Sequence, residues 1–490
     1  MPRLISTSTR SGPPEASWLT LEDPGSNEMM VPFSGRCGTG PASAMYDLFR
    51  RAAYRALSEP RRRLVHREIA HALAALPDPD GALACDVAHH AALGDDAALC
   101  AQASLSAGAR AARLFAGAEA REIVERALRL AASFPAARRI PLSLALLRIA
   151  VDASRTSSGD PGLVPRIRAL VEEARRDGFR PEVAAGCAVL ALAHWANRDD
   201  AGTAEATAIG GDALRDVSLR EAALETAELV ACLASLERDL PRVRTLAAEA
   251  RRLGPLPPRA AGNLAMGEGI LAAIDGRAEE AAAFLERGVR LCRDVLPWEE
   301  SPVLARLALI DLELGRPERV LERTARMREI GPRFGDGSAG AFANLLEVAA
   351  RQHHGEDVPE EELAGDLAAL EMDSKLRLAQ AACALGELDL AAGRTERARR
   401  LLLRGCAAAD AVARPSLAVT TRALLARAEL AHGDPRAARE HVEVARGTLH
   451  SLLPAARAVR LLREAAAAAG LAATPLEERG QPSGQPAAAR

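Results

Sequence analysis

The sequence contains few aromatic residues and almost no lysine. Phe, Trp and Tyr together make up 3 % of its 490 residues, and Lys375 is the single lysine beside a large number of arginines. Runs of β-branched residues are also scarce, which argues against a large sheet, because sheets favour β-branched and aromatic side chains. The arginine bias is typical of a GC-rich genome, and selection for phosphate binding is the alternative explanation.

The chain also lacks a strong net charge and a long apolar run. Its formal net charge is −3, so no global electric field attracts it to nucleic acid or anionic lipid. No stretch approaches the roughly 20 apolar residues that span a bilayer, and residues 1–15 lack the apolar core of a secretory signal. We therefore expect a cytoplasmic protein that contacts neither membranes nor nucleic acid.

Cysteine is present, but no two cysteines have the spacing of a metal site or a CxxC pair. The cysteines are Cys37, Cys85, Cys100, Cys187, Cys232, Cys292, Cys383 and Cys406. Most of them lie in apolar helical stretches, where cysteine serves as a small buried side chain. We interpret them as reduced structural thiols rather than as a disulfide or zinc framework.

Ala, Leu, Arg and Glu dominate the sequence, and all four favour helix. Apolar residues recur at three- and four-residue spacing between short turns of Gly, Asp and Pro, as in packed helices. Residues 1–43 and 471–490 lack this period and any strand period, and they are rich in Pro, Gly and small polar residues. We predict a disordered leader and a disordered tail for these two segments.

Short turns recur along the chain at a nearly constant interval of 37 to 40 residues. The turn residues are Gly159, Asp199, Asp239, Gly276, Gly315, Gly355, Gly393 and Gly433. A period of about 39 residues holds two helices of roughly 14 residues with their turns. The interval therefore predicts a series of helical hairpins, and turns near Gly94 and Gly117 extend the series toward the N-terminus.

The residues around each turn indicate where the helices end and begin. In residues 312–327 (LELGRPERVLERTARM) and 430–445 (LAHGDPRAAREHVEVA), Gly follows an apolar helix end and Pro opens the next helix. Gly adopts the left-handed conformation that terminates a helix, and Pro fits the first helical turn. Because one hairpin cannot bury its own apolar stripe, neighbouring hairpins stack into a superhelix with a concave face. We predict an all-α fold, a right-handed superhelical solenoid of tetratricopeptide-like hairpins over residues 136–470.

Residues 45–73 (MYDLFRRAAYRALSEPRRRLVHREIAHAL) carry a family resemblance. The segment resembles the one that opens the helical repeats of STAND-class ATPase regulators, which include LuxR-type regulators and multidomain kinases. The matching positions are Asp47, Leu48, Phe49, Arg50, Tyr54, Leu57, Arg63, His66, Ile69 and Ala70. Residues 88–130 continue the resemblance, so residues 44–135 are predicted to form the start of the helical arm. The resemblance implies a sensor or scaffold region in bacterial signalling or transcriptional regulation.

The ATPase and the DNA-binding domain of that family are not predicted in this sequence. Residues 1–44 are too few for a phosphate-binding βαβ unit, and we expect them to be a remnant or a misassigned start. Residues 35–42 have the glycine spacing of a P-loop, but Pro41 and Ala42 stand where the lysine and the hydroxyl residue are required. We therefore expect no nucleotide cofactor.

No candidate catalytic or metal-binding residue emerges from the remaining motifs. His66 and His71 are five residues apart and do not share a helix face, whereas zinc-binding helices use spacings of three or four. The adjacent pairs His89-His90 and His353-His354 point in different directions and are interpreted as solvated or close to turns. The acidic pairs are interpreted as solvated residues or helix N-terminal stabilisers; they are Glu172-Glu173, Glu279-Glu280 and Glu360-Glu361-Glu362.

The run from Arg61 to Arg63 follows Pro60 without interleaved aromatic residues, so a helix surface patch is favoured over a nucleic-acid contact. Trp195, Trp298 and Phe342 are candidates for lining the concave groove, and burial in the core is the interpretation that we favour. The sequence thus predicts a non-catalytic scaffold that binds a protein, a peptide or a small effector. Its alternatives are a regulatory subunit that acts beside a separate ATPase or DNA-binding protein, and an enzyme with an unrecognised site.

Overall fold

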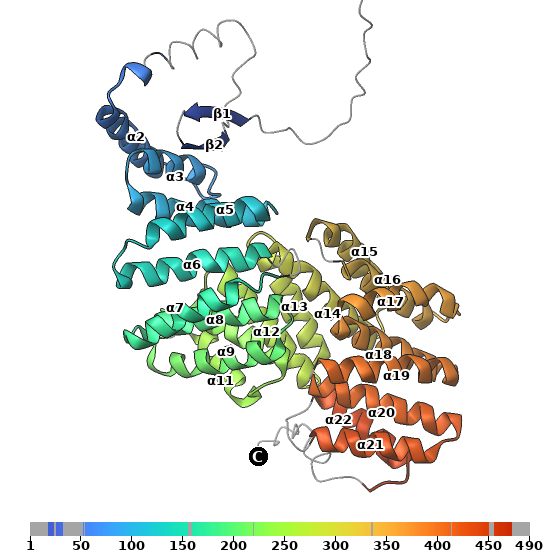
Figure 1. Ribbon diagram of the computed structural model, residues 1–490. Coiled ribbons are helices and arrows are strands. Elements are labelled where there is room, and N and C mark those ends of the chain that lie inside the picture. Colours follow the sequence, from blue (N-terminus) through green and yellow to red (C-terminus); the bar gives the residue numbers. More distant parts are fainter. Residues whose placement is uncertain are drawn as a thin grey trace, which may run out of the picture.

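The computed structural model describes residues 18–23, 26–32, 52, 54–154, 159–218, 220–334, 337–412, 414–449 and 455–472. Apart from one short β-hairpin, the secondary structure of this part of the chain is helical. Consecutive helices pair as antiparallel hairpins, and the hairpins stack side by side along a curved path (Figure 1). The all-α solenoid of tetratricopeptide-like hairpins is therefore confirmed.

Each hairpin has a first and a second helix. The first helices are α4 (Ala97–Arg113), α6 (Ala136–Ser154), α8 (Arg180–Ala196), α10 (Ala223–Leu236), α12 (Pro258–Ile274), α14 (Glu300–Glu313), α16 (Ala339–His353), α18 (Lys375–Ala391) and α20 (Pro415–His432). The second helices are α5 (Gly117–Ala131), α7 (Leu163–Arg176), α9 (Asp200–Ala213), α11 (Leu240–Arg252), α13 (Ala278–Cys292), α15 (Pro317–Ile330), α17 (Glu360–Asp373), α19 (Thr395–Ala411) and α21 (Pro435–Leu449).

Further helices flank the hairpins or connect them. The flanking helices are α2 (Glu59–Ala74) and α3 (Ala84–Leu93) on the N-terminal side and α22 (Ala456–Ala468) on the C-terminal side. Short 3-10 turns connect hairpins at η1 (Leu214–Asp216), η2 (Pro297–Glu299) and η3 (Gly331–Phe334).

All eight predicted turn residues lie between the first and the second helix of one hairpin. The six glycines among them have positive φ angles, from 67° at Gly315 to 92° at Gly433. Asp239 also adopts a left-handed conformation, with φ of 44°. The Asp199 side chain instead caps α9, because its Oδ1 accepts a hydrogen bond from the Gly202 amide at 2.8 Å. The spacing in the sequence thus located the chain reversals.

The two helices of a hairpin are buried differently. In α13 the buried residues are Ala281, Ala282, Leu285, Gly288, Val289 and Cys292, which follow one helical stripe. In α12 almost every residue from Ala260 to Ile274 is buried, because this helix packs against neighbours on several sides. Second helices therefore form the outer layer, and first helices line the interior of the solenoid.

The first helices pack on one another in two continuous runs, α4 to α12 and α14 to α22. Between the runs, the connection is made by α13 against α14. Figure 1 shows the chain bending there, so that the orange and red helices turn back beside the green ones. The two runs consequently face each other across the interior.

Polar contacts join the two runs. Arg198, after α8, donates to Asp373 at 3.0 Å, and Arg414, before α20, donates to Asp200 at 3.1 Å. The Ser416 amide donates to Glu237 Oε2 at 2.8 Å. These residues are separated by 175 to 214 positions in the sequence. The superhelix is thus tightly closed rather than an open arc.

The N-terminal segment departs from the prediction. An antiparallel hairpin pairs β1 (Trp18–Asp23) with β2 (Ser26–Pro32), and Leu19 lies opposite Val31. Residues 1–43 show no strand period, and these two segments nevertheless pair as strands. The P-loop-like residues 35–42, Cys37 and residues 473–490 lie outside the described residues.

No helix within the described ranges is both long and apolar enough to cross a membrane.

All seven described cysteines are thiols, and all except Cys85 are buried. Burial raises the pKa of Cys187 and of Cys383 to about 12. Because only the thiolate reacts readily, we expect these thiols to be inert in the folded protein. With Cys37 replaced by serine, Ellman's reagent should label fewer than two thiols quickly at pH 8, and all seven in guanidinium chloride. Rapid labelling of most thiols under native conditions would contradict the packing described above.

Candidate ligand-binding cavity

A cavity of about 510 Å³ lies between the two runs of first helices. Its walls come from α8, α14, α16 and α18, and from the residues that directly precede α20. Its aromatic and cationic side chains are Trp195, Arg198, Trp298, Arg306, Phe342, Lys375, Arg377 and Arg414. We call it the aromatic cavity. The structure thus brings together all three aromatic residues that the sequence offered as groove candidates.

The three aromatic residues line the cavity and are also partly or fully buried. Both interpretations made from the sequence, groove lining and burial, therefore hold in part. Phe342 is fully buried and Trp298 is buried, whereas Trp195 is half-buried. Arg414 lies over the Trp195 ring, with its guanidinium carbon 5.3 Å from the ring centroid. Arg377 lies 6.0 Å from the centroid of Phe342. Such cation–π contacts hold the cationic groups at the aromatic wall.

The lining of the aromatic cavity carries more positive than negative charge. Five cationic side chains face two carboxylates, Asp200 and Asp373. Both carboxylates accept hydrogen bonds from arginine, Asp200 from Arg414 and Asp373 from Arg198. The cavity is therefore suited to a ligand with an apolar body and negative charge.

A second cavity of about 440 Å³ adjoins the first, and Arg306 and Gln380 line both. It lies among α10, α12, α14, α18, α20 and α22. Its charged wall is paired within itself, because Arg457 binds both Glu313, at 3.2 Å, and Glu387. The two cavities thus lie next to each other in the interior of the solenoid.

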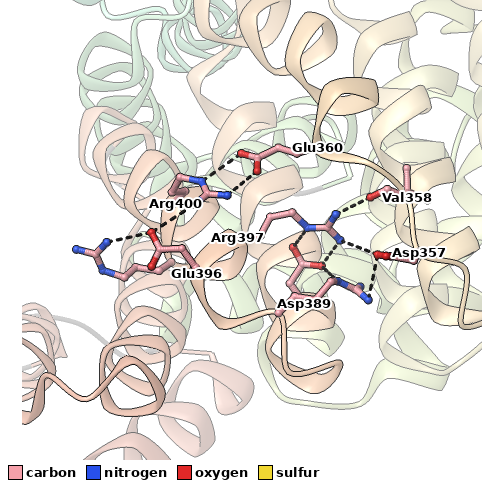
Figure 2. Close-up of polar contacts among 9 residues, drawn as sticks. Asp357, Val358, Glu360, Asp389, Glu396, Arg397 and Arg400 are labelled. Carbon is pink, nitrogen blue, oxygen red and sulfur yellow. Dashed lines mark hydrogen bonds and ion pairs between the residues drawn. The ribbon is translucent and has the colours of Figure 1, made fainter.

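A charged cluster near the end of α18 is saturated by its own partners. Figure 2 shows the cluster around Asp389, a fully buried residue near the end of α18. Its carboxylate accepts hydrogen bonds from Arg394 Nε at 2.7 Å and from Arg397 Nε at 2.7 Å. Arg397 also donates to the Val358 carbonyl, which ties this hairpin to the preceding one. This cluster has the features of an inter-repeat clamp rather than of a ligand site.

The basic run of α2 and the acidic pairs are also engaged within the protein. Arg62 donates to the Leu57 carbonyl at 3.0 Å and lies 5.0 Å from the Tyr54 ring centroid, and Arg63 pairs with Glu59. The acidic residues pair with arginines: Glu172 with Arg175, Glu173 with Arg139, Glu279 with Arg316, Glu280 with Arg277, Glu360 with Arg400 and Glu362 with Arg351.

The structure keeps His66 and His71 apart, as predicted, but His89 and His90 are less solvated than expected. His66 and His71 have separate partners, because His66 contacts Tyr54 and His90, whereas His71 contacts Asp96. His89 and His90 are half-buried rather than solvated, and the Nδ1 atoms of His66 and His90 are 2.7 Å apart. Local spacing does not reveal this pair, since 24 positions separate its members. No group of three or more His, Cys, Asp or Glu residues suited to a metal ion occurs among the described residues.

The histidine cluster predicts acid sensitivity at the N-terminal end of the array. Burial, together with the charges of His90 and His66, lowers the pKa of His89 to about 4. In the unfolded chain the pKa is near 6.5, so the unfolded state takes up a proton first as the pH falls. The stability contributed by neutral His89 is therefore complete above pH 6.5 and is lost between pH 6.5 and 4. We expect a loss of about 2 kcal/mol between pH 7 and pH 5.

Hydrogen exchange of α3 amides at pH 7 and pH 5, corrected for intrinsic rates, measures this loss. A His89→Leu variant should lose most of the pH dependence, whereas replacement of the exposed His432 by leucine should leave it unchanged. An unaltered pH dependence in His89→Leu would refute the assignment.

Sequence reasoning missed Arg306 and Arg414 as cavity residues, although both break local patterns. Arg306 is the one charged residue between Glu300 and Asp311, in the otherwise apolar α14. Arg414 is the N-cap residue of α20, a position that normally takes Ser, Thr, Asp or Asn. A cation at that end of a helix is also disfavoured by the helix dipole. Residues that break such patterns are candidates for a role in binding.

Comparison with known proteins finds similarity to solved structures. No protein-family model matches the chain, and no curated protein matches it. The chain is similar to the crystal structure of NprR in complex with its cognate peptide NprX, with 13 % identity and a TM-score of 0.39. The similarity covers 57 % of this chain and 81 % of that chain. Identity this low says nothing about what this chain binds.

Proposed function

We propose that the chain is a non-catalytic helical-repeat scaffold that binds a peptide or a segment of a partner protein in the aromatic cavity. The observation that carries the proposal is the convergence of Trp195, Trp298 and Phe342 with several arginines on one cavity. Aromatic and arginine side chains are the residues that dominate binding energy at protein interfaces. Exposed Arg198 and Lys375 lie at the rim, which gives a ligand a route from solvent to the buried wall.

The proposed setting is bacterial signalling or transcriptional regulation. It rests on the resemblance of residues 45–73 to the segment that opens the helical repeats of STAND-class regulators. In such regulators the helical array acts beside an ATPase, which here would be a separate protein. Both carboxylates of the cavity wall bind arginine, so neither is placed as a general base, which favours binding over catalysis.

The test compares peptide binding by the native chain with binding by a variant whose cavity is filled. Fluorescein-labelled nonapeptides of acidic, neutral and basic composition are titrated with protein, and fluorescence anisotropy is measured. Gln380 lines both cavities and is half-buried, so Gln380→Trp fills the space where they meet. We expect at least one peptide class to bind, and Gln380→Trp to weaken that binding about tenfold or more.

The matched control is Gln102→Trp, which introduces the same side chain at an exposed position of α4. It should bind as the native protein does, and both variants should keep the native circular dichroism and melting profile. Equal binding by the native protein and Gln380→Trp, or no binding of any peptide class, would contradict the proposal.

A further inference from the structure

The wall of the aromatic cavity contains a guanidinium with an unused donor. Arg414 is only 6 % exposed. Its Nη2 donates to Asp200 at 3.1 Å, but its Nη1 has no hydrogen-bond partner within the described part of the chain. Buried arginine nitrogens without an acceptor are costly, so an acceptor at this position would stabilise the protein.

A second buried donor without a partner is part of the same wall. The indole Nε1 of Trp298 has no acceptor among the described residues, and Trp298 is buried. Tryptophan N–H groups usually have a partner when they are buried. Two residues of one cavity lining, Arg414 and Trp298, thus each have a hydrogen-bond donor without an acceptor among the described residues.

Arg306 adds a second guanidinium to this wall. Its one hydrogen bond to a described residue goes to Ser235 Oγ, at 3.3 Å, and no described carboxylate lies within ion-pair distance. Arg306 and Arg414 line the same cavity, and burial together with the positive charge of Arg414 lowers the pKa of Arg306 to about 10, against the opposing charges of Glu299 and Glu237. An anion near both guanidinium groups would offset their positive charge.

Helix dipoles strengthen the positive potential. Both α18 and α20 begin at the cavity, and their N-terminal ends carry partial positive charge. Lys375 in the first turn of α18 and Arg414 before α20 add full charges at positions where stability alone would favour carboxylates. Backbone and side chains together therefore give the cavity a positive electrostatic potential, which favours anions.

We propose that the aromatic cavity binds a carboxylate carried on an apolar body, with Arg414, Arg306 and the Trp298 indole as its donors. This inference rests on the proposed function, since it names the chemical group by which a bound peptide would be recognised. A free C-terminus and an acidic side chain are the two peptide sources of that group.

Intrinsic fluorescence reports directly on this cavity. The sequence contains three tryptophans, and two of them, Trp195 and Trp298, line the cavity. In a Trp18→Phe background the emission therefore comes from the cavity wall alone. The probes are benzoate, benzamide and benzamidine, which have nearly the same shape and carry charges of about −1, 0 and +1 at pH 7.

We expect benzoate to change the tryptophan emission saturably, with benzamide at least tenfold weaker and benzamidine weaker still. Arg414→Gln and Arg306→Gln should each reduce the preference for benzoate over benzamide to about twofold or less. Arg414→Lys should keep part of it, because the charge remains. The matched control is Arg422→Gln, a half-buried arginine of α20 that pairs with Asp410 away from the cavity.

Equal binding of benzoate and benzamide, or an unchanged preference in both arginine variants, would overturn the inference. Should Arg414→Gln fail to fold, Arg306→Gln alone decides the question. With nonapeptides, amidation of the C-terminus and replacement of Glu by Gln separate the two sources. Peptide binding that is lost in Gln380→Trp but ignores charge would refute this inference and leave the proposed function standing. A benzoate preference without any peptide binding would refute the proposed function and leave the carboxylate site standing.

Discussion

Replacing Glu228 by alanine is expected to destabilise the first run of the solenoid by about 3 kcal/mol. Glu228 of α10 is 2 % exposed and lies between an arginine of α6 and an arginine of α12. It pairs with Arg148 of α6, and it accepts from Arg259 of α12 at 3.2 Å. Arg259 in turn binds Asp152 of α6 at 2.5 Å. The cluster thus joins the hairpins of α6, α10 and α12, and its removal leaves two guanidinium groups with too few acceptors.

Native-state hydrogen exchange measures this loss where it occurs. Repeat arrays need not unfold in one step, so a single melting temperature does not define the local free energy. Amides of α6, α10 and α12 should exchange on the order of a hundredfold faster in Glu228→Ala. Glu440→Ala, which removes an exposed pair with Arg436, should change the free energy by less than about 0.5 kcal/mol. Equal effects of the two variants would show that the buried cluster contributes no more to the free energy of unfolding than an exposed ion pair does.

Replacing Asp389 by alanine is expected to loosen the second run by a similar amount, about 3 kcal/mol. Asp389 is fully buried, and its loss would deprive Arg394 and Arg397 of a shared acceptor. Arg397 would then hold the preceding hairpin only through the Val358 carbonyl and a 4.0 Å contact with Asp357 (Figure 2). We expect the interface of α17 with α18 and α19 to open first.

Limited proteolysis and hydrogen exchange of α17 to α19 distinguish this outcome from general unfolding. In Asp389→Ala the faster exchange should be concentrated in these helices, while α4 to α8 keep the native rates. Asp389→Asn should be less damaging, because the amide oxygen still accepts one hydrogen bond. A uniform change along the whole solenoid would contradict the local role assigned to the clamp.

The sequence specified the hairpins because their signals are local. Glycine turns, prolines in the first helical turn and the spacing of apolar residues each act within a few residues. Eight turn positions therefore matched the structure. The strands β1 and β2 were missed because their sequences show little regular alternation of apolar and polar residues.

The cavity could not be predicted because its walls depend on how far the stack curves. That curvature is a sum of small rotations between hairpins, and it brings Trp195 close to Arg414 across more than half of the array. The three aromatic candidates were correct as residues, but only the structure shows that they share one wall.

The buried acidic residues at the ends of first helices recur at a fixed position in the sequence, but this position does not predict their partners. Asp311, Asp389 and Glu429 each stand four residues before a turn glycine. Their arginine partners differ, because Asp389 binds Arg397 of its own hairpin, whereas Glu429 binds Arg399 of the preceding hairpin at 3.0 Å. A repeated acid thus marks a buried position, and the identity of its partner depends on the local packing.

Photo-crosslinking of a bound peptide tests most directly whether the interior of the solenoid is the binding surface. An acidic nonapeptide carrying a benzophenone group is irradiated with the native protein, and the crosslinked residues are located by mass spectrometry. We predict crosslinks on α8, α14, α16 and α18 that disappear in the presence of unlabelled peptide. Competed crosslinks confined to the outer helices, such as α13 or α19, would contradict the account.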